Sequence, residues 1–227
     1  MRFLGIPLTF EPTYFALVVL GMMQGNSIAA YSGAPSAGQG LIAGFTVVCI
    51  ITLSILLHER AHVYAANAYK INCREIRLFA LGGVALLEEF PKTPGKYFMV
   101  AVAGPIASAT LFFVLAHLYP HPLGSSYSLL YGLVAYAARI NFVLATFNLL
   151  PISPLDGGRM LYATLWKFLN NAALARIYTR RVAKSIMIIL LVILLTGMAT
   201  RTISLFSFIW FLLIGYFLWQ AQDAPLQ

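Results

Sequence analysis

The segment HERAH brings two histidines and a glutamate together at residues 58 to 62. Residues four apart lie on one face of an α-helix, so His58 and His62 can turn a ring nitrogen toward the same metal ion while Glu59 stands beside it. The spacing H-E-x-x-H is therefore suited to binding one metal ion through two imidazoles, with a carboxylate next to them. The segment therefore predicts a metal site on one helix face.

The surroundings of HERAH are apolar, which is unusual for a cluster of ionisable side chains. Residues 41–57 form an apolar run that continues into the segment. On insertion scales, an Arg, Lys or Asp inside a membrane-spanning helix costs about 2.5–3.5 kcal/mol. Ionisable residues gathered at this place require compensation, and a bound metal ion would provide it.

Two histidines do not complete a catalytic zinc site, because zinc there takes a third protein ligand and leaves a fourth position for water. Asp156 is the best candidate for the third ligand. The remaining acidic residues besides Glu59 flank a hairpin predicted within 71–90 or lie near the chain ends: Glu75, Glu88 and Glu89, and Glu11 and Asp223. An aspartate followed by Gly157, Gly158 and a helical run can also be an ordinary helix N-cap, and the local pattern leaves that alternative open.

The elements that must position these residues are membrane helices. Of the 227 residues, 60% are hydrophobic and 10% charged, which excludes an ordinary soluble domain. Six apolar runs are each near the roughly 20 residues that cross a bilayer as a helix. They are 13–31, 41–57, 97–118, 127–150, 182–199 and 202–219. We expect an all-α polytopic membrane protein with about six transmembrane helices.

The distribution of positive charge predicts the orientation. Lys and Arg gather in the loop 69–96 and the segment 151–184, whereas the loops 24–40 and 118–127 hold none. Positively charged loops stay on the cytoplasmic side. We therefore expect both termini in the cytoplasm and a site toward the cytoplasmic side, where the three candidate ligands lie at similar depth. The net charge of +8 is then explained by topology and contact with anionic lipid, without nucleic acid.

Between the second and third spans, residues 71–90 are too polar at their ends to cross the bilayer and are rich in Ile, Leu, Val and Phe. With Gly82 and Gly83 at the middle, they predict a small β-hairpin. An exposed strand edge near these glycines can pair with the extended backbone of a substrate. The alternative is a purely structural loop.

The fourth span ends in FNLLPISPLDGGRM, where Pro151 and Pro154 prevent a regular helix. Asn148, just before them, can hold a substrate backbone or an oxyanion through its amide. Asn141 lies seven residues earlier on the same face, and we expect it to make an interhelical hydrogen bond. The stretch 157–181 is expected to be a basic surface helix that leads into the fifth span.

No repeat or long polar linker divides the chain. We expect a single intramembrane domain with its core at about 41–165 and no soluble regulatory domain. Cys49 and Cys73 do not suggest a disulfide framework. The small residues of AVAGPIASA, 101–109, fit close helix packing.

Four motifs in order carry a resemblance to a known family. HERAH in a membrane helix is followed by FALGGVA, AGPIAS and NLLPISPLDGG. In these motifs the chain resembles the site-2 protease family of intramembrane zinc metalloproteases. The resemblance implies that His58, His62 and Asp156 bind one zinc ion per chain. It also implies that Glu59 is the catalytic base and that Asn148 lies in the active site.

The resemblance covers about residues 41 to 165 and includes three departures. Arg60 stands where the family usually has an apolar residue, Ala61 where glycine is frequent, and Ser153 where proline is frequent. None of them removes a ligand. Because family members cut a transmembrane segment of another protein, often releasing a regulator, the resemblance implies a membrane-anchored protein substrate.

Two other functions fit the same ligands. A metal transporter or metal-binding membrane protein would hold the ion without needing Glu59 as a base, and an inactive relative would bind membrane segments as a scaffold. The endopeptidase reading is the only one of the three that depends on Glu59. Arg60 and Arg139 have no account at this stage, and the oligomeric state stays open.

Overall fold

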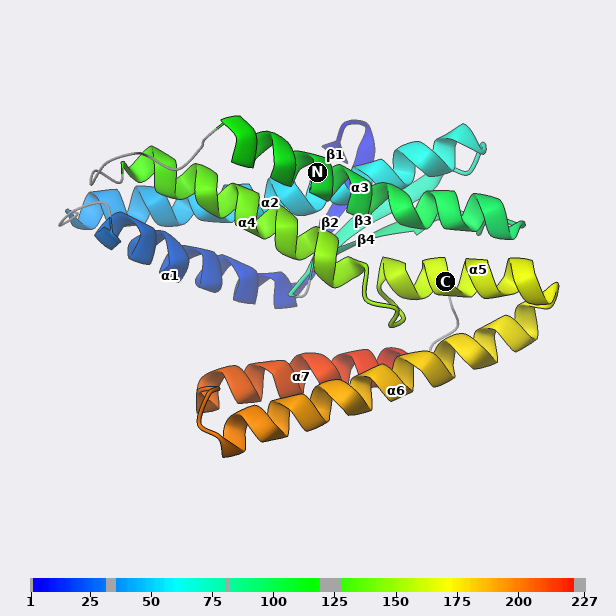
Figure 1. The fold of residues 1–227 in the computed structure, drawn as a ribbon. Helices are drawn as coiled ribbons and strands as arrows, with labels where there is room; N and C mark the ends of the chain where they lie inside the picture. Colours follow the sequence, from blue (N-terminus) through cyan, green and yellow to red (C-terminus); the bar gives the residue numbers. More distant parts are fainter. Residues whose placement is uncertain (1, 32–35, 81, 119–127, 223–227) are drawn as a thin grey trace. The chain divides into compact units, whose positions relative to one another are not determined.

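The computed structural model describes residues 2–31, 36–80, 82–118 and 128–222. Helices make up most of this part of the chain, and four short strands form one sheet (Figure 1). The backbone groups into two compact units, Met1–Glu89 with Ala103–Thr146 and Phe90–Val102 with Phe147–Gln227. Each unit is described by itself.

The first unit begins with a short extended segment and two helices. These elements are β1 (Arg2–Phe3), β2 (Ile6–Phe10), the 3-10 helix η1 (Pro12–Tyr14), α1 (Phe15–Tyr31) and α2 (Ala37–Ala68). At the start of α2, Ser36 Oγ accepts a hydrogen bond from the Gln39 amide, and the Gln39 side chain accepts one from the Ser36 amide. This capping box fixes where α2 begins. α1 packs closely on α2, since a side chain at Gly25 would collide with the Gly44 backbone.

The hairpin expected at 71–90 is present. Its strands are β3 (Cys73–Phe79) and β4 (Gly82–Leu87), which pair antiparallel. β2 adds in parallel to β3, and β1 pairs antiparallel with β2, so the strand order is β1-β2-β3-β4. The N-terminal strands were not predicted, because short strands that pair with a distant segment leave no local turn signal. β4 is the edge strand of the hairpin, whereas β2 covers its other edge.

The sheet packs on α2 through one of its faces. Side chains of β3 alternate between the two faces, with Ile76 and Leu78 buried and Glu75 and Arg77 on the other side. The buried cluster beneath the sheet joins residues of β2, β3 and α2: Leu8, Val47, Ile51, Ile55, Leu56, Ile76 and Leu78. This cluster holds the sheet against the turns of α2 that precede HERAH.

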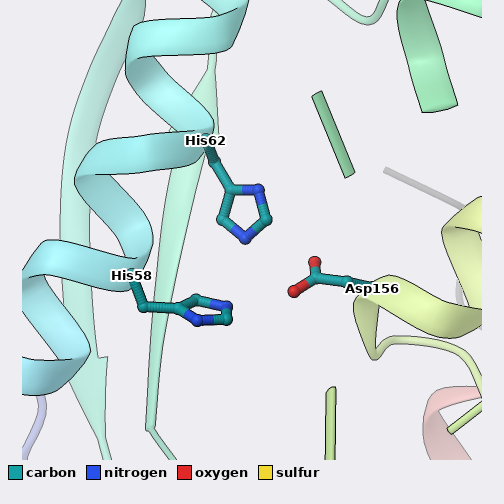
Figure 2. Close-up of side chains that lie close together, drawn as sticks. All are labelled: His58, His62 and Asp156. Atoms are coloured by element: carbon teal, nitrogen blue, oxygen red, sulfur yellow. The ribbon is translucent and has the colours of Figure 1, made fainter. Parts of the chain in front are cut away.

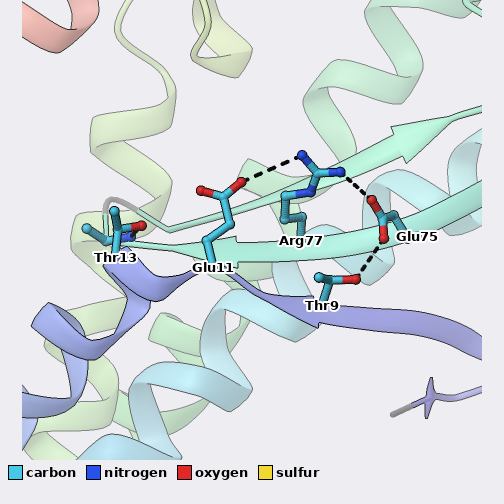
Figure 3. Close-up of polar contacts among 6 residues, drawn as sticks. Thr9, Glu11, Thr13, Glu75 and Arg77 are labelled. Atoms are coloured by element: carbon cyan, nitrogen blue, oxygen red, sulfur yellow. Dashed lines mark hydrogen bonds and ion pairs between the residues drawn. The ribbon is translucent and has the colours of Figure 1, made fainter.

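A polar network on the other face ties β2 to β3 (Figure 3). Thr9 Oγ1 donates to Glu75 Oε2 at 2.7 Å, and Arg77 Nη2 donates to Glu75 Oε1 at 2.6 Å. Arg77 Nη1 also lies 3.6 Å from Glu11 Oε1. These contacts lower the pKa of the Glu75 carboxyl, mainly through the Thr9 hydrogen bond and then through Arg77.

Two further helices complete the first unit: α3 (Pro94–Leu118) and α4 (Leu129–Asn148), each of which continues into the second unit at one end. Asn141 of α4 is 2% exposed and donates through Nδ2 to Ser54 Oγ of α2 at 3.0 Å. The interhelical hydrogen bond predicted for Asn141 is therefore confirmed. This bond connects α2 with α4, and the His58 contact described below connects α2 with α3.

The second unit contains α5 (Asp156–Leu169), α6 (Ala172–Ala199) and α7 (Leu205–Ala221). The stretch 157–181, predicted to be helical, is helical except for a break between α5 and α6. Asn170 adopts the left-handed conformation with φ 49°, and the Asn171 side chain caps α6 by accepting from the amides of Ala173 and Leu174. Asparagine suits both positions.

Five helices in the described part of the chain are long and apolar enough to cross a membrane. They are Pro12–Ala30, Gly38–Ala68, Pro94–Leu118, Leu129–Asn148 and Ala172–Ala199. They match the first five predicted spans. The sixth predicted run, 202–219, coincides with the shorter apolar helix Ser207–Ala221.

Candidate active site

The two histidines of HERAH project from one side of α2 (Figure 2). His58 is 3% exposed and His62 is 4% exposed, and their ring centroids lie 5.0 Å apart. α2 is unbroken through this region, so the four-residue spacing gives the pair a shared helix face. Two imidazoles are thus buried side by side in an apolar helix.

Gly104 and Ser108 of α3 define where the imidazole nitrogens lie. A Cβ atom at Gly104 would fall 2.5 Å from His58 Nε2 and would also collide with His62 Nε2. Both Nε2 atoms therefore meet at the same place on the α3 backbone. His58 Nδ1 lies 2.9 Å from the Ser108 hydroxyl, and a hydrogen bond donated from Nδ1 leaves the lone pair on Nε2.

This donor set fits a zinc ion. Neutral imidazole nitrogens are preferred zinc ligands, and a hydrogen bond from the second ring nitrogen is the usual means of fixing their orientation. Because residue 104 is a glycine, it places no side-chain atom where the two Nε2 atoms meet. Sequence reasoning interpreted AGPIAS as a packing motif and missed this role. The four-residue spacing of Gly104 and Ser108, which puts them on one helix face, was the signal.

Glu59 is buried next to the histidines, at 7% exposure, and its side chain turns toward the hairpin. Its Oε2 atom accepts a hydrogen bond of 2.9 Å from the backbone amide of Ala85 in β4. A Cβ atom at Gly83 would lie 2.9 Å from Glu59 Cγ, so the strand runs directly against this side chain. A buried carboxylate that can accept a proton therefore stands beside the two imidazoles.

Asp156 is the first residue of α5 and is 5% exposed; Figure 2 draws it at the beginning of that helix. The N-cap position belongs to Leu155, which makes no side-chain capping bond, so Asp156 is not the ordinary N-cap that its local sequence allows. The carboxylate lies 3.8 Å from Arg159, one turn along the helix. A carboxylate in the first turn is favoured by the helix dipole.

The predicted substrate-binding residues lie at element ends. Asn148 is the last residue of α4 and is half-buried. Gly82 opens β4 with φ 140°, a conformation that L side chains rarely adopt, and Gly83 follows it. Glycine is therefore needed at position 82 for its backbone conformation and at position 83 for the close contact with Glu59.

Other residues singled out in the sequence have no part in this cluster. Arg60 keeps Nε and Nη1 buried without a hydrogen-bond partner among the described residues, and Arg139 is exposed on α4. Cys49 and Cys73 are free thiols, as expected for a chain without a disulfide framework. Burial raises the pKa of the Cys73 thiol to about 11.

Comparisons with known proteins agree with this arrangement. The family model of peptidase family M50 matches residues 46–132 and 124–196. The Synechocystis protein sll0528 is 33% identical over 220 residues, which cover 95% of this chain and 56% of that protein. Zinc metalloprotease MJ0392 of Methanocaldococcus jannaschii is 31% identical over 221 residues, 92% of this chain and 57% of that protein. The chain thus spans about half the length of the curated relatives it matches.

A solved structure shares the fold. The site-2 protease from Methanocaldococcus jannaschii superposes with a TM-score of 0.65 and 25% identity, covering 100% of this chain and 94% of that one. The long apolar helices and the family match make the chain an integral membrane protein. It belongs to peptidase family M50, the site-2 protease family of zinc metalloproteases.

Proposed function

We propose that this chain is a zinc-dependent endopeptidase that hydrolyses a peptide bond in or near a transmembrane segment of a membrane-anchored protein. The observation that carries the proposal is the meeting of His58 Nε2 and His62 Nε2 at Gly104, beside the buried carboxylate of Glu59. This cluster lies on α2, a helix that is apolar enough to span a membrane. Peptide hydrolysis at membrane depth is the chemistry that such a cluster suits best.

His58, His62 and Asp156 would hold one zinc ion per chain. The two imidazoles supply nitrogen ligands. Asp156 supplies a buried carboxylate and lies in NLLPISPLDGG, the motif that resembles the ligand-bearing segment of the family. When bound, zinc supplies a Lewis acid that polarises the scissile carbonyl and lowers the pKa of a water molecule toward neutrality. Ser108 would fix the His58 ring for this purpose.

Glu59 would act as the general base and acid. It takes the proton of the attacking water and passes it to the nitrogen of the departing amine, so that one carboxylate serves both proton transfers. Asn148 would hold the substrate backbone or the developing oxyanion through its side-chain amide. An extended substrate segment would pair with the β4 edge at Gly82 and Gly83, since β4 is the edge strand of the hairpin.

The decisive experiment compares wild type with Glu59→Gln in proteoliposomes, measuring bound zinc and cleavage of a reporter with one transmembrane helix. We expect equal zinc content, with cleavage lowered by roughly 100- to 10,000-fold in the variant, the usual contribution of a general base. Half-buried Glu75, on the face of the sheet opposite the core, provides the control Glu75→Gln, which should cleave at the wild-type rate. Undiminished cleavage by Glu59→Gln would refute the proposed role of the glutamate.

The same vesicles test the transporter alternative. Zinc uptake that is unchanged by Glu59→Gln, without any reporter cleavage by wild type, would replace the protease by a metal carrier. Binding of the reporter without zinc flux or cleavage would instead indicate a scaffold. Neither outcome is expected, because a carrier has no use for a carboxylate held beside the ligand histidines by the backbone of β4.

The proposal includes an orientation and a substrate class. Lys and Arg gather at 69–96 and 151–184, which supports the proposal that both termini and the catalytic residues face the cytoplasm, with α7 as a short sixth span. We further propose that residues 41–165 form the core of a single catalytic domain. Its substrate is a membrane-anchored protein, and cleavage would release a regulator from the membrane.

A further inference from the structure

The hairpin holds the side chain of Glu59 at two points. Near the carboxylate, the Ala85 amide donates to Oε2 at 2.9 Å. At the stem, Gly83 lies so close that a Cβ atom there would be 2.9 Å from Glu59 Cγ and 2.8 Å from Ile55 Cγ2. Both contacts come from β4, and both are made by residues that sequence reasoning did not connect with Glu59.

The Ala85 amide belongs to the open edge of the sheet. Amides of successive residues in a strand point to opposite sides, so residues three apart also point to opposite sides. Glu88, three residues after Ala85, donates its amide to Asn72 O on the β3 side. The Ala85 amide therefore points away from β3, at the edge where no strand within the described residues pairs with β4. Glu59 therefore accepts a hydrogen bond from an amide that takes no part in the pairing of β3 with β4.

From these contacts we infer that β4 is the positioning element of the catalytic base. The Ala85 amide fixes the carboxylate plane by holding Oε2, which makes Oε1 the oxygen that exchanges protons with water and leaving amine. Gly83 lets the strand approach closely enough for this bond to form. The inference rests on the proposed function, in which Glu59 is the base, and it assigns to Ala85 and Gly83 positioning roles distinct from zinc binding.

The test removes the amide and leaves the strand. Proline at an edge position whose amide points outward loses no ladder hydrogen bond and is tolerated there. We expect Ala85→Pro to lower kcat by roughly 10- to 100-fold, the cost of misplacing a catalytic group by about 1 Å. KM for the reporter and zinc content should stay at their wild-type values, because the proposed substrate pairing is at Gly82 and Gly83, and the Ala85 amide already donates to Glu59.

Leu87→Pro is the matched control. Leu87 lies two residues further along β4, so its amide points to the same open edge, but Glu59 bonds to Ala85 and not to this amide. Leu87→Pro should retain kcat within about twofold. An equal fall of kcat in both variants would overturn the inference, because the loss would then come from the proline and not from the missing bond.

Two further outcomes keep the inference separate from the proposed function. If Ala85→Pro raised KM at unchanged kcat, the amide would belong to the substrate edge and not to Glu59, which overturns the inference while the protease stands. If the proline variant fails to fold, replacing Ala85 by lactic acid in cell-free synthesis exchanges the N–H for an ester oxygen without adding a ring, with the same expected fall in kcat. Inactive wild-type protein would instead refute the proposed function itself.

Discussion

The two segments that carry the proposed zinc ligands are built in different ways. His58 and His62 lie within an unbroken helix, where their geometry follows from helix periodicity alone. Asp156 begins α5 directly after the irregular stretch 149–155. The first arrangement depends on side-chain packing around a regular backbone, whereas the second depends on the path of the backbone itself.

The two glycines after Asp156 make that path possible. A Cβ atom at Gly157 would collide with the carbonyl oxygens of Leu149 and Leu150, and one at Gly158 would lie 2.5 Å from the Ser153 amide nitrogen. The chain before α5 therefore folds back onto its first turn. The ligands on the regular helix should therefore keep their fold when a small side chain is added nearby. The segment of Asp156 should not, because an added side chain there meets backbone atoms.

The largest expected effect tests whether both segments supply ligands. We expect His62→Ala and Asp156→Ala each to lower zinc affinity by more than about 100-fold, beyond the loss caused by removing an outer-shell partner. Zinc content after dialysis against a graded chelator series measures this, with Glu75→Ala as the control. Wild-type zinc retention by Asp156→Ala would contradict a ligand role for Asp156, because α2 alone would then hold the ion.

A second prediction contrasts two glycine-to-alanine changes. Gly104→Ala brings a methyl group 2.5 Å from His58 Nε2, so we expect zinc affinity to fall by about 100-fold at an unchanged or higher Tm. Alanine is also the better helix former by about 0.5–1 kcal/mol. Gly157→Ala meets backbone atoms instead and should destabilise the fold by about 1–3 kcal/mol. Thermal unfolding and zinc titration of both variants distinguish these effects, and equal loss of Tm in both would contradict the contrast.

A third prediction concerns the hydrogen bond that orients His58. Ser108→Ala removes the hydroxyl at Nδ1 and should weaken zinc binding by about 10-fold. Ser54→Ala is the matched control, since Ser54 is also buried on a helix–helix contact but bonds to Asn141. The control should lose about 1 kcal/mol of stability with unchanged zinc affinity. A zinc defect of the same size in Ser54→Ala would show that packing and not the His58 bond is responsible.

The sequence predicted the features that depend on local periodicity. HERAH falls on a helix, residues 71–90 form a hairpin, and five of the six apolar runs are long helices. The contacts that support Glu59 were beyond sequence reasoning, because they join α2 to a strand through one backbone amide. A backbone donor carries no side-chain signature, and which residue supplies it depends on strand register.

Two misses have different physical origins. The parallel pairing of β2 with β3 joins residues more than sixty positions apart, and such pairing follows from tertiary packing and not from any local pattern. The break between α5 and α6 was visible in principle, because Asn170 and Asn171 favour a left-handed turn and an N-cap. The basic, helix-favouring composition around them outweighed that signal.

The smallest effect concerns the outer face of the sheet. The Arg77–Glu75 ion pair there is partly exposed, and its contribution to stability should depend on pH. The pKa of Glu75 is lowered in the folded state, so the stabilisation is fully present above the unfolded value near 4.5 and is lost as pH falls through the folded value. We expect Glu75→Gln to lower Tm by roughly 1–3 °C at pH 7 and by less at pH 3. Thermal unfolding in detergent at both pH values checks this sign. A Tm difference that grew on acidification would contradict this sign. A Tm difference that persisted at high salt would show that the Thr9 hydrogen bond contributes more to stability than the Arg77 ion pair, since salt screens only the ion pair.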